Sequence, residues 1–389
     1  MTGIASDVRD AELAHRRGAA AFAGPPPGAR SGSVTRAAAR TGLIGAAGGG
    51  RLWWRWFRRG EARVAGFWQR AMIGLARSGR ARDFAQRQAW LAGLASRFTG
   101  GPAVTAAVAA AGALRAEGIS ASLFYLGEYV EDPAVVAATV SQLARAAEAL
   151  AAAGLDVSVS ADPTQLGLMD SPAACEANLR RVAAAVARAC GPAARHGHDA
   201  VMLDMEDSAA TGVTLGLHDQ LRQDGLPAAI TVQAYLHRTT GDLARLAAAG
   251  AWVRLVKGAF AEPAAVAATR RAEITQRYRQ GAMTLLSPRS RDAGCYPAFA
   301  THDERIIGEI ITTARAHGWA DDQFEFEMLH GARPDLQRAL ASRGHQVRVY
   351  LPFGTDWFPY AIRRVGESPR NIRFTLTAIT RRPARPHAT

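Results

Sequence analysis

Polar side chains that suit acid–base or anion-binding chemistry recur along this sequence, most of them close after a short apolar segment. Asp204 follows one such segment, and Arg254 and Lys257 stand three residues apart at the end of another. Carboxylates serve as general acids or bases, and a guanidinium beside an ammonium binds phosphate or stabilises negative charge. The whole set comprises Glu128, Asp162, Thr164, Gln165, Asp204, Glu206, Asp207, Gln233, Arg254, Lys257, Thr301, His302, Asp303, Glu327, His330 and Tyr350.

A second group of residues with binding chemistry lies near the C-terminus. Tyr360, Arg363 and Arg364 have the i, i+3, i+4 spacing that places side chains on one face of a helix. Two arginines beside an aromatic ring can clamp a carboxylate while the ring covers an apolar body. The alternative is a solvated basic turn of helix. An alternating strand and a Pro-Gly break come just before, and this setting fits a binding site at a strand end equally well.

The elements that must position these residues alternate between short apolar segments and longer helical ones. Eight βα units over about 260 residues predict an α/β fold, a (βα)8 TIM-type barrel with an N-terminal helical extension. A doubly wound sheet is the alternative, but no GxGxxG follows any predicted strand. The predicted strands are 120–126, 156–161, 200–205, 229–235, 252–257, 297–301, 324–329 and 347–351, and helices include 133–153, 172–195, 239–249, 263–279, 304–317 and 334–342.

The chain divides by composition into three parts. Residues 1–60 are a basic segment rich in Ala, Gly and Pro that we expect to be largely disordered. Residues 61–118 are predicted to be helical, and 119–380 form the barrel. Residues 51–59 interleave tryptophan with arginine, which suits either contact with an anionic membrane surface or a helix docked on the body.

Charge and cysteine content narrow the functional class. The net charge is +13, but residues 1–100 hold 17 arginines and 5 acidic residues, whereas the remainder holds 30 basic and 29 acidic residues. A neutral body argues against nucleic-acid binding. Three cysteines without metal-ligand spacing indicate a reducing, cytoplasmic compartment. No charge-free run of 18 apolar residues is present, which argues against a membrane span.

Three chemistries fit the polar residues at the strand ends. A metal site using Asp204, Glu206, His302 and His330 lacks a recognised ligand spacing. A Schiff base could form on Lys257, the only lysine in the chain. An anion-rich cofactor held by Arg254 and Lys257 fits better.

Taken together, the motifs resemble the proline dehydrogenase family, flavoenzymes built on a (βα)8 barrel. They occur in the family's order, one for each predicted strand, and cover about residues 95–375. The matching stretches are Leu126-Gly-Glu-Tyr-Val130, Thr164-Gln-Leu-Gly-Leu168, Val201-Met-Leu-Asp-Met-Glu-Asp-Ser208, Val232-Gln-Ala-Tyr-Leu236, Val253-Arg-Leu-Val-Lys-Gly-Ala259, Phe299-Ala-Thr-His-Asp303, Phe324-Glu-Phe-Glu-Met-Leu-His-Gly331, and Tyr350 through Asn371.

The resemblance implies FAD-dependent oxidation of L-proline to 1-pyrroline-5-carboxylate, with hydride transfer to flavin N5 and electrons passed to a quinone-type acceptor. Asp204 and Arg254 match the family's active-site pair, and Arg254 would stabilise negative charge on the reduced flavin. Glu128 resembles the acid that pairs with a clamp arginine as a gate. Cofactor contacts would be Met205, Gln233, Arg254, Lys257, Gly258, Ala259, Thr301 and His302, and substrate contacts Arg363, Arg364, Tyr350, Tyr360, Leu329, Asp162 and Glu128.

Several positions depart from the family pattern. Asp162 stands where a lysine usually helps to hold the substrate carboxylate, and an anion there would repel that group. Glu327 stands for a glutamine and Phe124 for an aspartate. An enzyme of the same family that acts on another cyclic or secondary amino acid or amine is therefore the alternative. Because family members commonly reduce membrane quinone, residues 51–59 are a predicted peripheral membrane contact.

Overall fold

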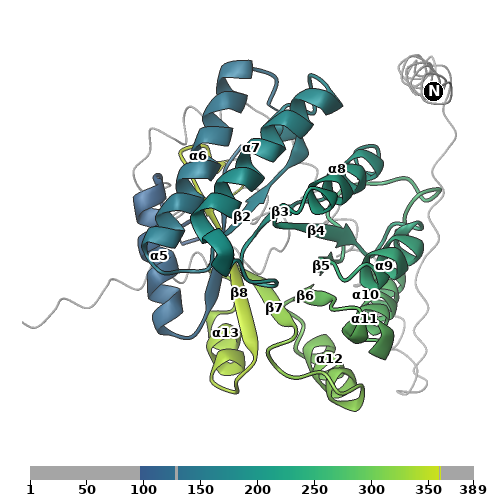
Figure 1. The fold of residues 1–389 in the computed structure, drawn as a ribbon. Coiled ribbons are helices and arrows are strands. Elements are labelled where there is room, and N and C mark those ends of the chain that lie inside the picture. The colour runs from purple at the N-terminus through teal and green to yellow at the C-terminus, as the bar shows by residue number, and fades with distance from the viewer. Residues whose placement is uncertain (1–96, 128–129, 359, 361–389) are drawn as a thin grey trace, which may run out of the picture. The chain divides into compact units, whose positions relative to one another are not determined.

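The computed structural model describes residues 97–127, 130–358 and 360. Within them, eight parallel strands form a closed barrel in chain order, with β8 pairing to β1 (Figure 1). The elements are α5 (Val104–Ala116), β1 (Ser120–Tyr125), α6 (Pro133–Ala152), β2 (Ser158–Ala161), η1 (Pro163–Leu166), α7 (Pro172–Cys190), η2 (Gly191–Ala193), β3 (Ala200–Leu203), α8 (Thr211–Gln223), β4 (Ala228–Gln233), α9 (Thr239–Ala248), β5 (Trp252–Val256), α10 (Arg271–Leu285), α11 (Pro288–Asp292), β6 (Tyr296–Ala300), α12 (Glu304–Ala316), β7 (Glu325–Leu329), α13 (Pro334–Ala341) and β8 (Gln346–Phe353).

The predicted (βα)8 barrel is confirmed. Each strand pairs in parallel with the next along the chain, and the ring closes where Ser122 of β1 stands opposite Tyr350 of β8. Every strand lies at its predicted place. Such a closed ring leaves no strand edge exposed and brings all eight strand C-termini to one end.

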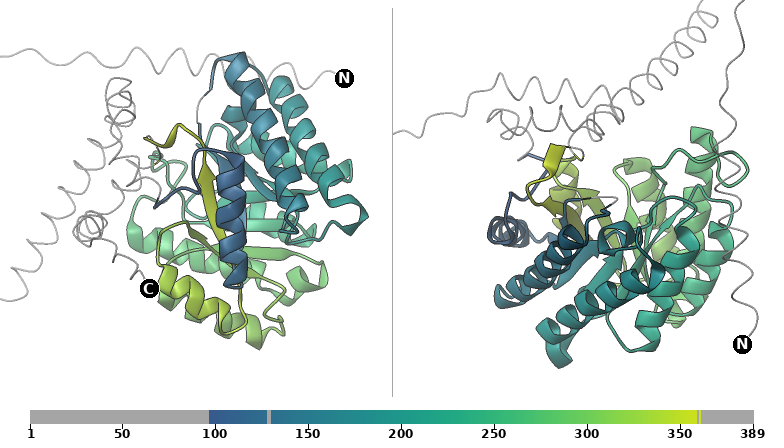
Figure 2. Two further views of the ribbon diagram at one scale, coloured as in Figure 1. Left: turned by 90° about the vertical axis from the view of Figure 1, so that its left-hand side faces the viewer. Right: turned by 90° about the horizontal axis from the view of Figure 1, so that it is seen from above.

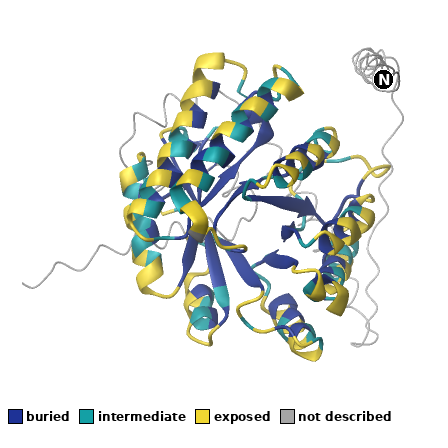
Figure 3. Cartoon of the chain, in the orientation of Figure 1, coloured by how far each residue is buried: buried dark blue, intermediate teal, exposed yellow. Residues whose placement is uncertain are grey.

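The barrel has a core on each side of its strands. Outward residues such as Leu123, Val201 and Phe326 pack against the helices in one large apolar cluster. Inward residues include a separate apolar group centred on Trp252 and Tyr296. Figure 3 shows buried strands at the centre and helices whose exposed faces point outward.

Several helices begin at capping residues. The carboxylates of Asp132 and Asp303 accept backbone N–H groups at the starts of α6 and α12. A proline takes the first position of α6 and again of α7, where its missing N–H has no consequence. These caps fix where the three helices begin.

Two helices flank the first strand. Helix α5 packs on β1 and β8, as the left view of Figure 2 shows. Helix α6 is long and apolar enough to cross a membrane by length and composition. It packs against α5, α7 and β2 within the barrel's outer ring. The core helix of a barrel meets the same criteria of length and composition.

The helix predicted over 263–279 is wrong in its first half, because α10 begins only at Arg271. The Ala-rich stretch before it folds back on the loop after β4. Ala268 N–H donates to the Tyr235 carbonyl, and His237 N–H donates to the Val266 carbonyl. These tertiary hydrogen bonds satisfy the backbone and override the local helix propensity. Helix α8 was not among the predicted helices.

Several predictions concern residues outside the described ones. They include the arginine clamp and gate residues Arg363, Arg364 and Glu128, the Trp/Arg segment 51–59, and the boundary near residue 60. Helix α5 is the described part of the predicted helical region 61–118.

Candidate active site

Arg254 is the centre of a buried charge cluster inside the barrel. Its side chain projects from the inner face of β5, and the residue is only 3% exposed. Its Nη1 lies 2.6 Å from Oδ1 of Asp204, and its Nε lies 2.6 Å from Oε2 of Glu327. Asp204 comes directly after β3, and Glu327 lies on β7. One guanidinium therefore holds carboxylates from opposite sides of the barrel.

Three hydroxyl groups from neighbouring strands complete the cluster. Both Nη atoms of Arg254 lie 3.3 Å from Oγ of Ser160, and Nη1 lies 3.4 Å from Oγ1 of Thr231. Thr231 in turn donates to Oδ1 of Asp204 at 2.9 Å, and Ser122 lies 3.2 Å from Ser160. These contacts hold the guanidinium in one orientation, because few of its donors are left to rotate toward other partners.

Tyr350 covers this cluster on the side of Asp204. Its hydroxyl donates to Oδ2 of Asp204 at 2.9 Å, and its ring centre lies 5.3 Å from Cζ of Arg254. Burial, with the nearby Asp204 carboxylate, raises the pKa of Tyr350 well above 10, so the phenol keeps its proton.

The charges of Asp204 and Arg254 follow from the surroundings of the two side chains. Burial raises the pKa of Asp204, and the Arg254 guanidinium and hydrogen bonds from Tyr350 and Thr231 act against that rise. Burial by itself would lower the pKa of Arg254, but the carboxylates of Glu327 and Asp204 outweigh it and the pKa is raised. Arg254 therefore remains a cation at any physiological pH.

An aromatic and apolar wall adjoins Tyr350. The ring of Phe124 lies 5.2 Å from the Tyr350 ring, and Tyr360, which is 4% exposed, belongs to the same cluster. Leu329 ends β7 nearby, and its N–H donates to Nε2 of His302 at 3.2 Å. The structure thus brings together the predicted ring-packing residues Tyr350 and Tyr360.

The predicted cofactor residues lie at the C-terminal ends of β3 to β6. Gln233 at the end of β4 donates from Nε2 to the Glu206 carbonyl at 2.7 Å and accepts the Ala259 N–H at 3.4 Å. Gly258 has a φ of +109°, and a Cβ there would clash with the ring of Tyr235. Only glycine fits, which lets the backbone of this loop approach a ligand closely.

The donors near this loop suit an anionic, hydrogen-bonding cofactor. Among the residues that the structure describes, the ammonium of Lys257 has no ion-pair partner. Thr301 Oγ1 accepts the Asp303 N–H at 3.2 Å, and Met205 is buried at 7% exposure. A cation, hydroxyl and imidazole groups and an open backbone suit a cofactor that carries negative charge and accepts hydrogen bonds.

The carboxylates considered for a metal have other partners. Glu206 accepts the Thr164 N–H at 2.9 Å and the Thr164 hydroxyl at 2.6 Å, which ties the loop after β2 to that after β3. Within the described part of the chain, no group of three or more His, Cys, Asp or Glu side chains is arranged to hold a metal ion.

Asp162, the departure predicted to affect substrate binding, lies directly after β2 and is 8% exposed. Its N–H donates to Oε1 of Gln165 at 3.3 Å. Its carboxylate adds to the rise in the pKa of Tyr350, so it lies within electrostatic reach of the phenol. An additional anion therefore lies near the aromatic wall beside Tyr350.

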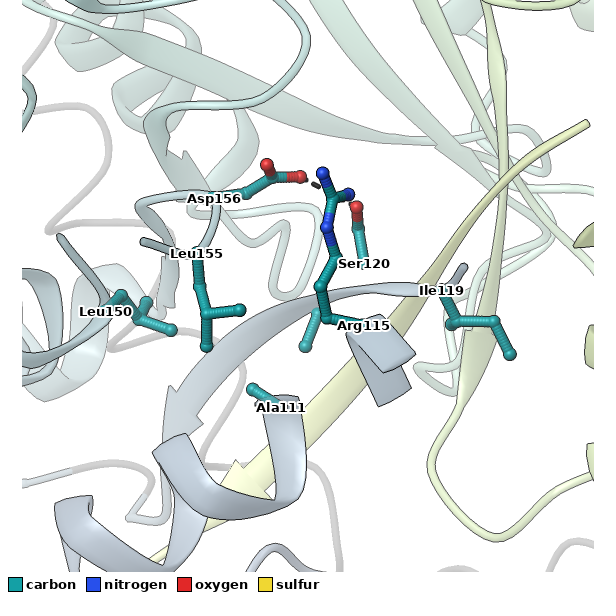
Figure 4. A pocket seen from close by; sticks show the side chains of 8 residues that line it. Ala111, Arg115, Ile119, Ser120, Leu150, Leu155 and Asp156 are labelled. Carbon is teal, nitrogen blue, oxygen red and sulfur yellow. Dashed lines mark hydrogen bonds between the residues drawn. The ribbon is translucent and has the colours of Figure 1, made fainter. Parts of the chain in front are cut away.

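A second charged layer lies below the first and was not predicted. Arg348 of β8 donates from Nε to both oxygens of Glu325 at 3.0 Å, and its Nη2 lies 3.5 Å from Asp156. Asp156 also accepts the Ser120 hydroxyl at 2.7 Å beside a small pocket at the strand N-termini (Figure 4). Burial disfavours the Asp156 anion, but His198 and Arg348 outweigh it, and the pKa of Asp156 is lowered.

Side chains alternate between the inside and the outside of the barrel along each strand. This alternation is the signal that would have identified the additional polar residues of the barrel interior. Thr231 and Glu325 each stand two positions before a site residue on the same strand, and Ser160 stands two positions before Asp162, which directly follows β2. Side chains of a strand share a face at that spacing. Because inward side chains form layers, polar residues at these positions extend the site downward.

The barrel is closed, and its charged cluster and the loop at Gly258 lie at the strand C-termini. Enzymes with this fold have their active sites at that end, so these features define a barrel enzyme. Comparison with known proteins specifies the family. The family model described as "Proline dehydrogenase" matches residues 107–376, and this chain belongs to that oxidoreductase family.

Relatives of similar length support the assignment. The chain is 36% identical over 314 residues to "Proline dehydrogenase" of Deinococcus radiodurans, which covers 79% of this chain and 96% of the relative. It is 34% identical over 289 residues to "Proline dehydrogenase 1" of Bacillus subtilis strain 168, covering 74% and 91%. Most of each relative is therefore matched by this chain.

Solved structures share the fold at lower identity. Proline utilization A from Bdellovibrio bacteriovorus, inactivated by N-propargylglycine, superposes with a TM-score of 0.65 at 21% identity. The match covers 82% of this chain and 38% of that one. The corresponding protein of Corynebacterium freiburgense gives a TM-score of 0.58 and 34% coverage of its own chain. This chain thus spans less than half the length of these structures.

Proposed function

We propose that this chain is a proline dehydrogenase that uses FAD to oxidise L-proline to 1-pyrroline-5-carboxylate. The observation that carries the proposal is the buried Arg254–Asp204 pair, which stands beneath Tyr350 at the strand C-termini. The family is generally flavin-dependent, and its model spans all eight strands of this barrel.

The cofactor would be held by Met205, Gln233, Lys257, Gly258, Ala259, Thr301 and His302, with Arg254 beside the flavin ring. When bound, FAD supplies N5 as the acceptor of the hydride from the proline ring carbon next to nitrogen. That nitrogen also loses a proton, and a C=N bond forms, so the substrate is oxidised by two electrons.

Asp204 acts in this proposal by positioning other groups. Its Oδ1 accepts from Arg254 and Thr231, and its Oδ2 accepts from Tyr350. Because both oxygens are occupied, the carboxylate fixes the guanidinium and the phenol relative to each other. The fixed Tyr350 ring, with Phe124 and Tyr360, provides an apolar wall for a pyrrolidine ring.

The substrate carboxylate requires a cationic partner, and we propose Arg363 and Arg364 for this role. The pair lies outside the described residues, and its support is the sequence motif and the family resemblance. Glu128 is proposed as the gate acid on the same grounds.

The test is an anaerobic titration of purified protein with L-proline, followed by the visible absorption of oxidised flavin. We expect the protein to carry flavin and proline to bleach it. A protein that neither carries flavin nor binds added FAD would overturn the proposed function.

A second substrate is favoured by one observation, the carboxylate of Asp162 near the Tyr350 wall. An anion there suits a cyclic or secondary amine that carries a hydrogen-bond donor or a cation. Flavin that proline leaves oxidised, but that such an amine bleaches, would select this alternative.

The electron acceptor is proposed to be a quinone, with a cytoplasmic protein that meets the membrane peripherally through residues 51–59. The support is the interleaving of tryptophan and arginine in that segment, which suits an anionic bilayer surface.

A further inference from the structure

Arg254 is shared by two carboxylates, although a single carboxylate would balance its charge. Asp204 occupies Nη1 and Glu327 occupies Nε, each at 2.6 Å. Glu327 is 2% exposed and belongs to the same buried cluster as Arg254 and Asp204. Its ion-pair partner there is Arg254, through which its charge acts on the site.

The small side chain of Ala298 allows this contact between strands that are not neighbours. β6 lies between β5 and β7, and Ala298 stands opposite both Arg254 and Glu325 in the strand register. A methyl group on the intervening strand leaves room for the guanidinium to reach Glu327. The contact is therefore built into the packing of the barrel interior.

A third carboxyl lies close to Glu327. Glu325 stands two residues earlier on β7, and side chains at that spacing share one face of a strand. Burial raises the pKa of Glu325 to about 8, and the neighbouring Glu327 adds to that rise. Glu325 is thus largely protonated at neutral pH, and Glu327 is the β7 carboxylate that pairs with Arg254.

We propose that Glu327 is a positioning residue that partly neutralises Arg254 and thereby lowers the reduction potential of the bound flavin. The proposal rests on the proposed function, in which Arg254 stands beside the flavin. Hydride uptake adds negative charge to the flavin, and a cation beside it favours that uptake. A guanidinium already paired with two anions favours it less, so Glu327 makes the flavin harder to reduce.

The test compares the flavin midpoint potential, measured anaerobically against a reference dye, in wild-type protein and in Glu327→Gln. The amide keeps the shape of the side chain and removes its charge. We expect the two-electron equilibrium to shift toward reduced flavin by at least tenfold, which corresponds to about 30 mV. Glu327→Asp keeps the charge but moves it away from Nε, so its potential should lie between those of wild type and Glu327→Gln.

Glu325→Gln is the matched control. Its amide keeps the size of the protonated carboxyl, and Glu325 pairs with Arg348 rather than Arg254. At neutral pH we expect its flavin potential to equal that of the wild type. A structural effect of altering buried β7 carboxyls would move the potential in both variants.

Three outcomes would overturn the inference while leaving the proposed function intact. They are an unchanged or lower potential in Glu327→Gln, equal shifts in Glu327→Gln and Glu325→Gln, and a Glu327→Asp potential at or below that of the wild type. The last outcome decides the question if Glu327→Gln fails to fold. Wild-type protein that binds no flavin would overturn the proposed function itself, and the inference with it.

Discussion

Removing Arg254 should destabilise the protein strongly, because it leaves two carboxylates buried without a cation. Arg254→Met has similar length and no charge. It removes both 2.6 Å ion pairs and the donors to Ser160 and Thr231. Breaking a buried ion pair by removing one partner typically lowers stability by about 3–5 kcal/mol. We expect the free energy of unfolding in urea to fall by that amount at pH 7.

The loss of stability in Arg254→Met should be smaller at lower pH. A buried carboxylate without a cation takes up a proton, so the folded variant binds more protons than the unfolded chain around neutral pH. Its stability therefore falls as pH rises, and the gap between variant and wild type should be wider at pH 8 than at pH 5. Urea unfolding curves at both pH values, followed by circular dichroism, measure this difference.

The double variant Arg254→Met/Glu327→Gln separates the orphaned charge from lost packing. It removes the Glu327 anion, while Asp204 keeps its hydrogen bonds from Thr231 and Tyr350. We expect it to regain about 1–2 kcal/mol relative to Arg254→Met, within the range of coupling energies between contacting residues. If Arg254→Met lost less than about 1 kcal/mol, or if the double variant were less stable than the single one, the electrostatic account would be refuted.

Three further predictions concern other parts of the chain. Glu325 holds its proton in the folded state from its ordinary pKa of 4.5 up to about 8, so stability should fall as pH rises through that window, and Glu325→Gln should flatten the profile in thermal unfolding. Arg364→Met should raise the KM for proline at least tenfold while flavin content stays constant, and an unchanged KM would remove the arginine from the proposed clamp. Deleting residues 1–60 should abolish binding to anionic liposomes in a sedimentation assay, and undiminished binding would exclude residues 51–59 as the membrane contact.

The barrel could be predicted because its signals are local. Short apolar strands, intervening helices and capped helix starts follow from sequence spacing, and all eight strands were placed correctly. The segment 263–270 could not be predicted in this way. Its alanines favour a helix, but backbone hydrogen bonds to Tyr235 and His237 hold it against a loop that is distant in sequence.

The sequence predicted which residues stand at the strand C-termini but only some of their contacts. Asp204 and Arg254 were identified as a pair, and the structure places them 2.6 Å apart. The link from Arg254 to Glu327 depends on the height of each residue in the barrel and on the small Ala298 between them. Heights follow from strand register, which is a property of the closed ring and cannot be read from one strand.

The barrel interior explains why the two carboxyls of β7 differ. In the two charged layers four carboxyl groups, on Asp156, Asp204, Glu325 and Glu327, pair with three arginines, Arg195, Arg254 and Arg348. Four buried anions would exceed the three cations by one, and burial makes such an excess expensive, so a proton must enter. Glu325 takes it because both burial and Glu327 disfavour its anion. The layer beneath the site thus absorbs the excess charge, and Glu327 stays available to Arg254 as an anion.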